Sequence, residues 1–465
     1  MNTRTKSTLE KALDINMDAS RYGSFAEIGA GQEVARQFFQ AGKASQTIAL
    51  TISAYDMTYS DIIYGKEKSG RYVCESRLRK MLDREYTKLL ERLDKTRGKN
   101  TNFFAFADTV ATSSETKKNS HGWLGVKFQH KPGAQPSDVI LHLRLLDKHR
   151  LQQQETLSVM GVNLIYAAFY HAKDGSEFVH SLFEQIKSGS ISVDALHFSG
   201  EAFKNFDEVA TNLQMVDQGW SEAIYINAEG KVQNPSDALW GKDILVQLAY
   251  YNPVTNTHLD VVDKGVKHFG KEFGIKSSDI VTLFEFTLNN RLKNTKISVN
   301  DALKKIKMLS SLKKPVMVSN FCLFYQLKEF LRQVSDKPLG IVIGASHLDR
   351  LFDEKFYSDL KGGILEGMGK LVDDKTRLYI YPHKTDMLCL QVRSFRPKPA
   401  MKNLYAHLLE NKFLQDIAGC DEIQEFVHSD DIINLVKKKD NRWKKLVPES
   451  VQSIWTEQLK AESRK

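Results

Sequence analysis

The residues whose types and spacing point most directly to chemistry are charged side chains inside strand-like apolar segments. Arg144 lies in VILHLRLLD, and Glu285 lies in IVTLFEFTLNN. A charged group inside a sheet costs free energy unless it is paired or contacts a ligand. Either these charges contact a ligand, or they form internal ion pairs such as Arg144 with Glu285 or Asp147. Our leading hypothesis is one shared ligand site, because open α/β sheets bind ligands at the carboxyl ends of their strands.

Each of these residues has a role that suits its side chain. The planar guanidinium of Arg144 suits a phosphate or a carboxylate, so we assign it to anion binding. Glu285 or Asp147 would act as the catalytic general base or hold a divalent cation. The same expected strand ends supply three further ligand-binding candidates: Asn163, Ser199 and Asn320.

A glycine pair ahead of a helix forms a second candidate anion site. Gly29 and Gly31 lie in AEIGAGQEVARQF, and glycines before a helix N-terminus let the backbone approach an anion. Asp56 follows the next strand, roughly where a dinucleotide fold places the acid that contacts ribose. The third glycine of that fingerprint is replaced by Val34, so a simple turn, or a methyltransferase-like loop, explains the pair equally well.

The elements that must position these residues predict an α/β fold class. We expect an N-terminal α+β region, then two consecutive Rossmann-like (βα) repeats, then a helical C-terminal region. Strand-like and helix-length segments alternate beyond residue 136, which favours parallel βα units. The expected regions are a polar arm at 1–20, the α+β domain at 21–135, the first repeat at 136–235, a connector at 236–278, the second repeat at 279–398, and helices at 399–465.

Two features define these expected boundaries. The Pro- and Gly-rich stretch KPGAQPS at 131–137 is typical of a linker, so we place a domain boundary there. Beyond it, 162–169 is interpreted as a strand carrying Asn163, matched in the second repeat by 316–320 carrying Asn320. The match suggests an internal duplication, although two unrelated α/β segments would share the same alternation.

The composition excludes several classes of protein. The net charge of +9 over 465 residues is small, and the basic stretch 66–99 has leucines at helical spacing, so an amphipathic helix is favoured over a nucleic-acid site. The polar N-terminus resembles no secretory signal, and no apolar run could cross a membrane. The four cysteines form no CxxC pair, which predicts free thiols, no structural zinc and a cytoplasmic location.

Several short motifs resemble a bacterial protein family of about this length. They are FAEIGAGQEVA, TISAYDM, FADTVAT, HGWLGVKFQ, GVNLIYAAFY and GGILEGMGKL. Members of that family carry the labels nicotinate-nucleotide adenylyltransferase or TonB-dependent receptor. The receptor label does not fit, because the many alternating strands of an outer-membrane barrel are not present in the sequence. The adenylyltransferase label lacks its HxGH and ISSTxxR-like motifs.

Taken together, these features predict an enzyme that acts on a phosphorylated or nucleotide-like small molecule, through nucleotide transfer or NAD-related metabolism. The cofactor stays open between Mg²⁺ and a nucleotide, and homo-oligomerisation is compatible with the sequence. The alternative is a non-catalytic scaffold that binds a regulatory partner through its helical end. A membrane or nucleic-acid partner is not expected.

Overall fold

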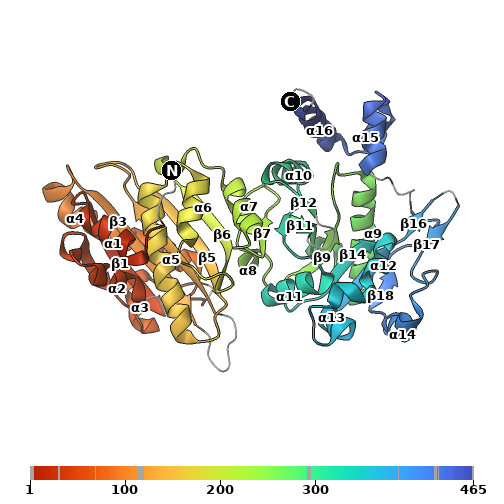
Figure 1. Cartoon of the computed structure of the whole chain (residues 1–465), viewed down its shortest axis with the longest axis horizontal. Helices are drawn as coiled ribbons and strands as arrows, with labels where there is room; N and C mark the ends of the chain where they lie inside the picture. Colours follow the sequence, from red (N-terminus) through yellow and green to blue (C-terminus); the bar gives the residue numbers. More distant parts are fainter. Residues whose placement is uncertain are drawn as a thin grey trace. The chain divides into compact units, whose positions relative to one another are not determined.

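The chain is divided into two compact units, Met1–Glu222 and Ala223–Lys465 (Figure 1). Each unit has its own sheet, and we describe each unit by itself. The computed structural model describes the following residues: 5–29, 32–68, 70–112, 120–290, 295–385, 387–423, 427 and 429–462.

The first unit is built on a six-stranded mixed sheet in the order β2-β1-β3-β4-β5-β6. β1 pairs in parallel with both β2 and β3, whereas β3, β4, β5 and β6 pair antiparallel in sequence. The strands are β1 (Arg21–Gly29), β2 (Ile48–Ile52), β3 (Asn102–Ala111), β4 (His121–Phe128), β5 (Ser137–Leu145) and β6 (Ile191–Ser199).

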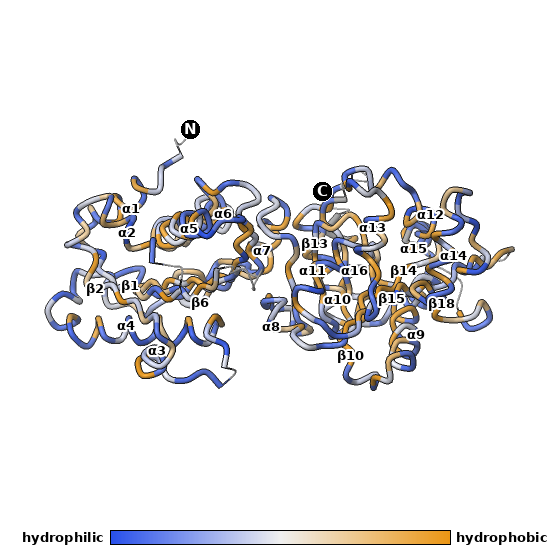
Figure 2. Tube along the Cα trace, turned by 90° about the horizontal axis from the view of Figure 1, so that it is seen from below, coloured by the Kyte–Doolittle hydropathy of each residue, from blue (hydrophilic) through white to orange (hydrophobic). Residues whose placement is uncertain are grey.

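Helices cover both faces of this sheet. In Figure 2, α1, α2, α5 and α6 lie on one side of the strands, and α3 and α4 lie on the other. Alternating strand residues fill the two interfaces: Phe104 and Phe106 pack toward α5, and Phe103 and Ala105 pack toward α4. The helices are α1 (Thr8–Met17), α2 (Glu33–Ala41), α3 (Met57–Tyr64), α4 (Glu75–Arg97), α5 (Arg150–Tyr170), α6 (Gly175–Phe183) and α7 (Glu208–Gln218), with short 3₁₀ turns η1 (Ala44–Gln46) and η2 (Glu201–Phe203).

Three expectations for this unit are corrected. Residues 162–169 belong to helix α5 and are not a strand. The stretch 131–137 connects β4 to β5, two neighbouring strands of one sheet, so it does not separate domains. The expected polar arm contains helix α1, which begins with a capping box between Ser7 and Glu10.

The second unit is built on an eight-stranded sheet in the order β18-β15-β14-β9-β10-β13-β7-β8. From β18 to β13 all pairings are parallel, and β7 and β8 extend one edge antiparallel. The strands are β7 (Ala223–Ile226), β8 (Val232–Gln233), β9 (Asp243–Leu248), β10 (Ile280–Thr287), β13 (Val316–Ser319), β14 (Leu339–Gly344), β15 (Thr376–Tyr381) and β18 (Leu414–Asp416). Two small antiparallel pairs lie outside it: β11 (Asn289–Asn290) with β12 (Thr295–Lys296), and β16 (His383–Lys384) with β17 (Cys389–Leu390).

Helices cover this sheet on both faces as well. Leu245 and Val342 pack with Phe269 of α9, whereas Val246 and Ile341 pack in the cluster that contains α11, α13 and α14. The helices are α8 (Pro235–Ala238), α9 (Asn256–Phe273), α10 (Val299–Ser311), α11 (Phe324–Val334), α12 (Leu348–Leu351), α13 (Gly363–Leu371), α14 (Lys402–Glu410), α15 (Ser429–Lys437) and α16 (Glu449–Glu462). Short 3₁₀ turns are η3 (Ser277–Asp279), η4 (Ala345–His347), η5 (Glu354–Tyr357), η6 (Pro399–Met401) and η7 (Asn441–Lys445).

The α/β fold class is confirmed, with the parallel strands concentrated in the second unit. The strand-like segment IVTLFEFTLNN contains β10, and the strand expected at 316–320 is β13. The first expected repeat differs, because β5 and β6 pair antiparallel in the first sheet and β7 joins the second. The expected connector at 236–278 contains a complete βα unit, β9 followed by α9, and β9 is a central strand.

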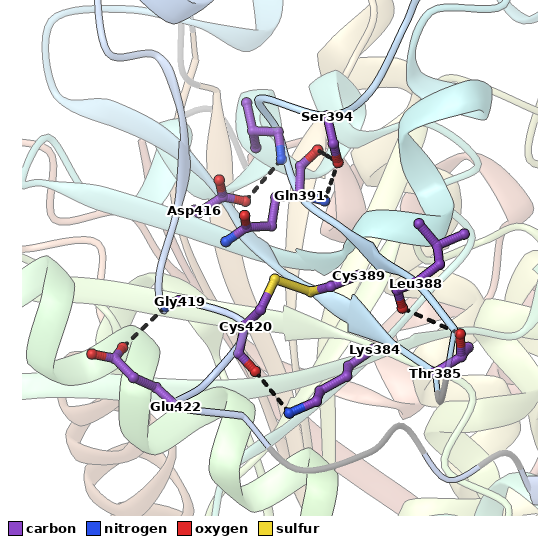
Figure 3. The surroundings of a disulfide bond; sticks show 11 residues. Lys384, Thr385, Leu388, Cys389, Gln391, Ser394, Asp416, Gly419, Cys420 and Glu422 are labelled. Atoms are coloured by element: carbon purple, nitrogen blue, oxygen red, sulfur yellow. Dashed lines mark hydrogen bonds between the residues drawn. A yellow bond between two sulfur atoms is a disulfide. The ribbon is translucent and has the colours of Figure 1, made fainter.

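A disulfide bond between Cys389 and Cys420 corrects the prediction that all four cysteines are free thiols (Figure 3). It joins strand β17 to the segment after β18, and the Lys384 ammonium donates to the Cys420 carbonyl 3.1 Å away. Cys74 and Cys322 are free. No helix in the described part of the chain is long and apolar enough to cross a membrane.

We expect loss of this disulfide to destabilise the second unit by about 3 kcal/mol, because the bond closes a loop over a sequence separation of 31. The test compares thermal unfolding with and without dithiothreitol, using the Cys389→Ser/Cys420→Ser double variant as the control that no longer responds to reductant. Intact mass after alkylation reports the bond directly. Two alkylated cysteines in the native chain agree with it, and four would contradict it.

Candidate functional site

A cavity of ≈ 660 Å³ lies at the carboxyl ends of the parallel strands of the second unit. In chain order the strands β9, β10, β13, β14, β15 and β18 take the sheet order 3-2-1-4-5-6, which places a topological switch point between β9 and β14. Doubly wound sheets bind ligands in the crevice outside the strand ends at this point. The polar lining residues include Gln247, Tyr251, His258, Glu285, Thr287, Lys296, Cys322, Ser346, His347 and Arg350.

Two acids line the cavity, Asp430 of α15 and Glu285, and Glu285 is the buried one. It is near the end of β10, opposite Leu248 of β9, and only 1 % of its surface is exposed. The Ser319 hydroxyl on β13 donates to its carboxylate at 2.5 Å. Burial raises the pKa of Glu285 to about 7, against the opposing hydrogen bonds from Ser319 and Thr287. This carboxyl group can therefore exchange a proton near neutral pH.

The loop after β9 supplies an aromatic wall and a neutral histidine. The Tyr251 hydroxyl donates to the Gln247 carbonyl at 2.8 Å, and its ring centroid lies 5.0 Å from that of His258. His258 accepts the Thr255 backbone N–H on Nδ1 at 2.9 Å, within the N-terminal cap of α9. Burial, aided by Lys305, lowers the pKa of His258 to about 4. His258 thus stays uncharged at neutral pH and serves as a cap rather than as an anion-binding cation.

Lys305 of α10 holds the loop after β9 in place through hydrogen bonds to its backbone. Its ammonium donates to the carbonyls of Tyr250 and Tyr251 at 2.8 and 3.1 Å, and it lies 4.0 Å from the centroid of the Tyr250 ring. Only 4 % of Lys305 is exposed, and burial lowers its pKa to about 8. Lys305 is therefore a positioning residue for the aromatic wall.

The positive side of the cavity comes from the segment after β14. Ser346 and His347 lie in η4, where the serine Oγ is 3.4 Å from Nδ1 of the histidine. Arg350 follows in α12, and its guanidinium carbon lies 5.2 Å from the centroid of the Phe356 ring. A guanidinium near a carboxyl-lined crevice suits a ligand that carries both an anionic group and hydroxyls.

Arg144, the predicted anion clamp, belongs to the first unit, whereas Glu285 belongs to the second. Its guanidinium Nε donates to Asp194 at 2.9 Å, and Nη2 donates to Ser192 at 3.0 Å and to Glu222 at 2.6 Å. Asp194 is buried; burial alone would raise its pKa, but Arg144 and His142 lower it below the usual value. Arg144 thus serves as the counter-ion of a buried acid.

The ionised Asp194 also fixes the tautomers of two histidines. Nδ1 of His142 is 3.0 Å from Asp194, and Nε2 of His142 is 3.1 Å from Nδ1 of His121. Because the carboxylate only accepts, His142 donates through Nδ1 and accepts from His121. Burial, together with His142, lowers the pKa of His121 to about 4, so His121 is uncharged at neutral pH.

The other predicted residues of the first unit have structural roles. Asp147 accepts the Thr156 hydroxyl at 3.1 Å and the Gln153 amide on its own carbonyl, ahead of α5. Asn163 is buried inside α5 and accepts the Lys11 ammonium at 2.8 Å, so its assignment to a strand end was wrong. Ser199 is exposed at the end of β6.

In the second unit, Asn320 follows β13 and accepts the Asn289 amide at 3.0 Å. It precedes the lining residues Phe321 and Cys322, and is itself outside the cavity wall. Among the predicted catalytic and ligand-binding residues within the described ranges, Glu285 is the one that lines this cavity.

Gly29 ends the first strand of a βαβ unit, since β1, α2 and β2 follow each other with β1 and β2 parallel. Gly29 has φ +86°, and a Cβ there would meet the Val110 carbonyl oxygen at 2.0 Å. Gly31 lies outside the described residues. Asp56 is the N-cap of α3 and accepts the Tyr59 N–H at 2.8 Å.

The place where a dinucleotide phosphate would contact α2 is filled by Glu27. Its carboxylate accepts the Val34 N–H at 2.9 Å and the Ala35 N–H at 3.4 Å, which are the first free amides of the helix. In the register of the sheet Glu27 lies opposite Asp108. Burial raises the pKa of Glu27 to about 8 and that of Asp108 well above its usual value.

Within the described residues, no group of three or more His, Cys, Asp or Glu side chains is arranged to hold a metal ion. The Mg²⁺ considered from the sequence therefore gains no ligand set in this part of the chain.

Sequence reasoning missed most of the cavity because it assigned 236–278 to a connector. The signal was present: DILVQL at 243–248 is a short apolar run, bounded by Gly241 and Pro253 and followed by helical spacing in α9. Cys322 follows the predicted strand at 316–320, and Arg350 lies in the short helix α12, so neither lies inside a strand. They are therefore residues that only the three-dimensional arrangement identifies.

No protein-family model matches the chain, and no curated protein matches its sequence. Similar solved structures include the competence/damage inducible protein CihA from Agrobacterium tumefaciens, at 17 % identity and a TM-score of 0.26, covering 36 % of this chain and 98 % of that chain. A competence-damaged protein (CinA) superfamily protein from Enterobacter cloacae matches at 11 % identity and a TM-score of 0.26, covering 36 % and 96 %. One from Klebsiella pneumoniae 700603 matches at 11 % identity and a TM-score of 0.27, covering 36 % and 99 %. The motifs resemble a family labelled nicotinate-nucleotide adenylyltransferase or TonB-dependent receptor. No family model or curated relative supports either label for this chain.

Proposed function

We propose that the second unit binds a phosphorylated, nucleotide-like small molecule in the switch-point cavity and that Glu285 acts on it as a general acid–base. The observation that carries this proposal is the position of Glu285, buried at the end of β10 and lining a ≈ 660 Å³ cavity beside the switch point. In folds of this topology, an acid at the end of the second strand contacts ribose hydroxyls.

The remaining lining residues support the same class of ligand. Tyr250 and Phe324 offer aromatic faces for a base, and Arg350 offers a guanidinium for a phosphate. The N-terminus of α9 carries no glycine-rich loop, and its first amides are capped by Thr255 and His258. The anionic group is therefore expected at Arg350 rather than at α9.

Glu285 has the acidity that a transfer or hydrolysis reaction requires. In either reaction the carboxylate takes the proton from an attacking hydroxyl or water, and then returns it to the leaving group. A pKa of about 7 makes both protonation states available at neutral pH. The cavity leaves both classes of reaction open.

The test of this proposal is thermal unfolding with AMP, ADP, NAD, ribose 5-phosphate and inorganic phosphate, each titrated to saturation. A ligand that binds the folded chain raises the melting temperature in a saturable manner. We expect a shift with at least one nucleotide and a smaller one with inorganic phosphate alone. Absence of any shift across this panel would contradict the proposal.

We expect Glu285→Gln to weaken binding of the best ligand by about 10- to 100-fold above pH 8, where the native carboxylate is ionised and accepts ligand hydroxyls. Below pH 6 the native group is protonated, so the two chains should bind almost equally. Calorimetric titration at both pH values measures this difference. The matched control is Glu366→Gln on α13, a half-buried acid outside the cavity that pairs with Lys370, and it should bind as the native chain does at every pH.

A further inference from the structure

The first sheet ends in a strand whose outer edge is uncharged. Figure 2 shows β2 beyond β1 at the end of this sheet, and within the described residues β2 pairs only with β1. Its sequence, IALTI, contains no charged residue and no proline, and Ala49, Leu50 and Thr51 are exposed. Natural edge strands carry Lys, Pro or bulges that prevent a second strand from pairing with them. Residues 49–51 carry no Lys and no Pro. The register with β1 shifts between Ile48 and Leu50, so the regularly paired part of the strand is 50–52.

Exposed apolar side chains continue from this strand into the helix that follows. Leu50 is 43 % exposed, Tyr55 69 %, Met57 61 %, Tyr59 57 % and Ile62 74 %. We call residues 48–62 the edge segment. Such a concentration of large exposed apolar side chains in one short segment is typical of an interaction surface.

The acids of the edge segment are engaged within the chain. Asp61 accepts the Arg77 guanidinium and the Tyr72 hydroxyl, each at 2.8 Å. Asp56 accepts the Tyr59 N–H as the N-cap of α3. Arg77 thus compensates the charge of Asp61, and no charged residue lies within β2 itself.

We propose that the edge segment is the interface of a homodimer, in which β2 pairs antiparallel with β2 of a second copy and the two α3 helices contact across the twofold axis. A twofold axis joins the same patch on both copies, so an uncharged strand meets an identical uncharged strand. The pairing would satisfy the outward-facing amides and carbonyls of β2 and join the two first-unit sheets into one.

The apolar area available matches what a reversible dimer needs. With about 200 Å² per side chain, the five exposed residues offer roughly 600 Å² of apolar surface per copy. Stable complexes bury about 800 Å² per partner, and the paired β2 backbones contribute the remainder. We expect a dimer that dissociates in the micromolar range.

The test is the mass of the full chain by sedimentation velocity between about 1 and 100 μM, with a transition from monomer to dimer expected. Leu50→Lys and Ile62→Glu, each on the exposed surface, should give monomers at every concentration while their circular dichroism and melting temperature stay native. The matched control, Leu365→Glu on α13, removes a leucine of the second unit that is 67 % exposed and should still dimerise.

Disulfide crosslinking tests the register in which the two β2 strands pair. Antiparallel pairing about a twofold axis brings the central residue of β2 next to its own copy, so Leu50→Cys should form a covalent dimer under mild oxidation and Leu365→Cys should not. A monomer at all concentrations would overturn the proposal. A dimer that persists in the Leu50→Lys and Ile62→Glu variants would also overturn the proposal. Binding of a different protein to the edge segment would overturn it as well.

Discussion

Replacing Glu27 by Gln is expected to stabilise the first unit by about 4 kcal/mol at pH 8 and to leave its stability below pH 4.5 nearly unchanged. Burial raises the pKa of Glu27 from 4.5 to about 8, so the folded chain keeps a proton that the unfolded chain releases above pH 4.5. The folded state binds more protons, and stability therefore falls as the pH rises toward 8. A side-chain amide is uncharged at every pH and abolishes this loss.

The new amide also fits the site. Its oxygen can accept the Val34 N–H that Glu27 accepts now at 2.9 Å, and its N–H₂ can donate toward the facing Asp108. The measurement is the free energy of unfolding from pH 4 to 9, with hydrogen exchange in β1 and β3 to locate the change. Glu33→Gln is the matched control, because Glu33 is on the surface of α2 and pairs with Arg36. Equal pH profiles for Glu27→Gln and the native chain would show that Glu27 is ionised throughout.

Replacing Arg144 by Met is expected to destabilise the first unit by about 4 kcal/mol, because it leaves the carboxylate of Asp194 buried without its counter-ion. Asp194 is 2 % exposed and receives two contacts from the guanidinium, at 2.9 and 3.1 Å. Methionine keeps the unbranched apolar stem of the arginine and removes the guanidinium, so the lost charge dominates the result.

A double variant separates the ion pair from simple packing. If Arg144 serves Asp194, adding Asp194→Asn to Arg144→Met should recover part of the stability, and the two effects should be far from additive. Arg36→Met, which removes an exposed arginine of the same unit, should change the unfolding free energy by less than about 0.5 kcal/mol. Additive effects of the two changes would contradict the pairing and return Arg144 to the list of ligand-binding residues.

Parallel strands β10 and β13 could be predicted because each lies in a short apolar run, as in VMVS of β13, whereas β9 was assigned to a connector. Helix α5 could not, because its segment from Leu157 to Ala168 is buried on nearly all sides. A helix without a polar face loses its 3.6-residue period, and VNLIYAAF then looks like a buried strand.

The candidate site was predicted only in part, for a similar reason. Glu285 stands out as an acid within an apolar strand, and the structure places it at the cavity. Arg144 stands out equally, yet its partner Asp194 is 50 residues away on β6. Neither segment by itself shows that β5 pairs with β6 and so brings Arg144 next to Asp194. The sequence therefore could not distinguish the ion-paired Arg144 from Glu285, which lines the cavity.

Helix α1 gives the first twenty residues a role that their polar composition conceals. Lys11 has no exposed surface, and its ammonium donates to Asn163 and to Ser181 while pairing with Glu184 at 2.7 Å. Helix α1 thus packs against the first unit with the ammonium of Lys11 buried between α5 and α6. A chain shortened to begin at residue 21 would leave Glu184 without this cation and open the apolar faces of both helices to water. Domain trimming should therefore spare this helix.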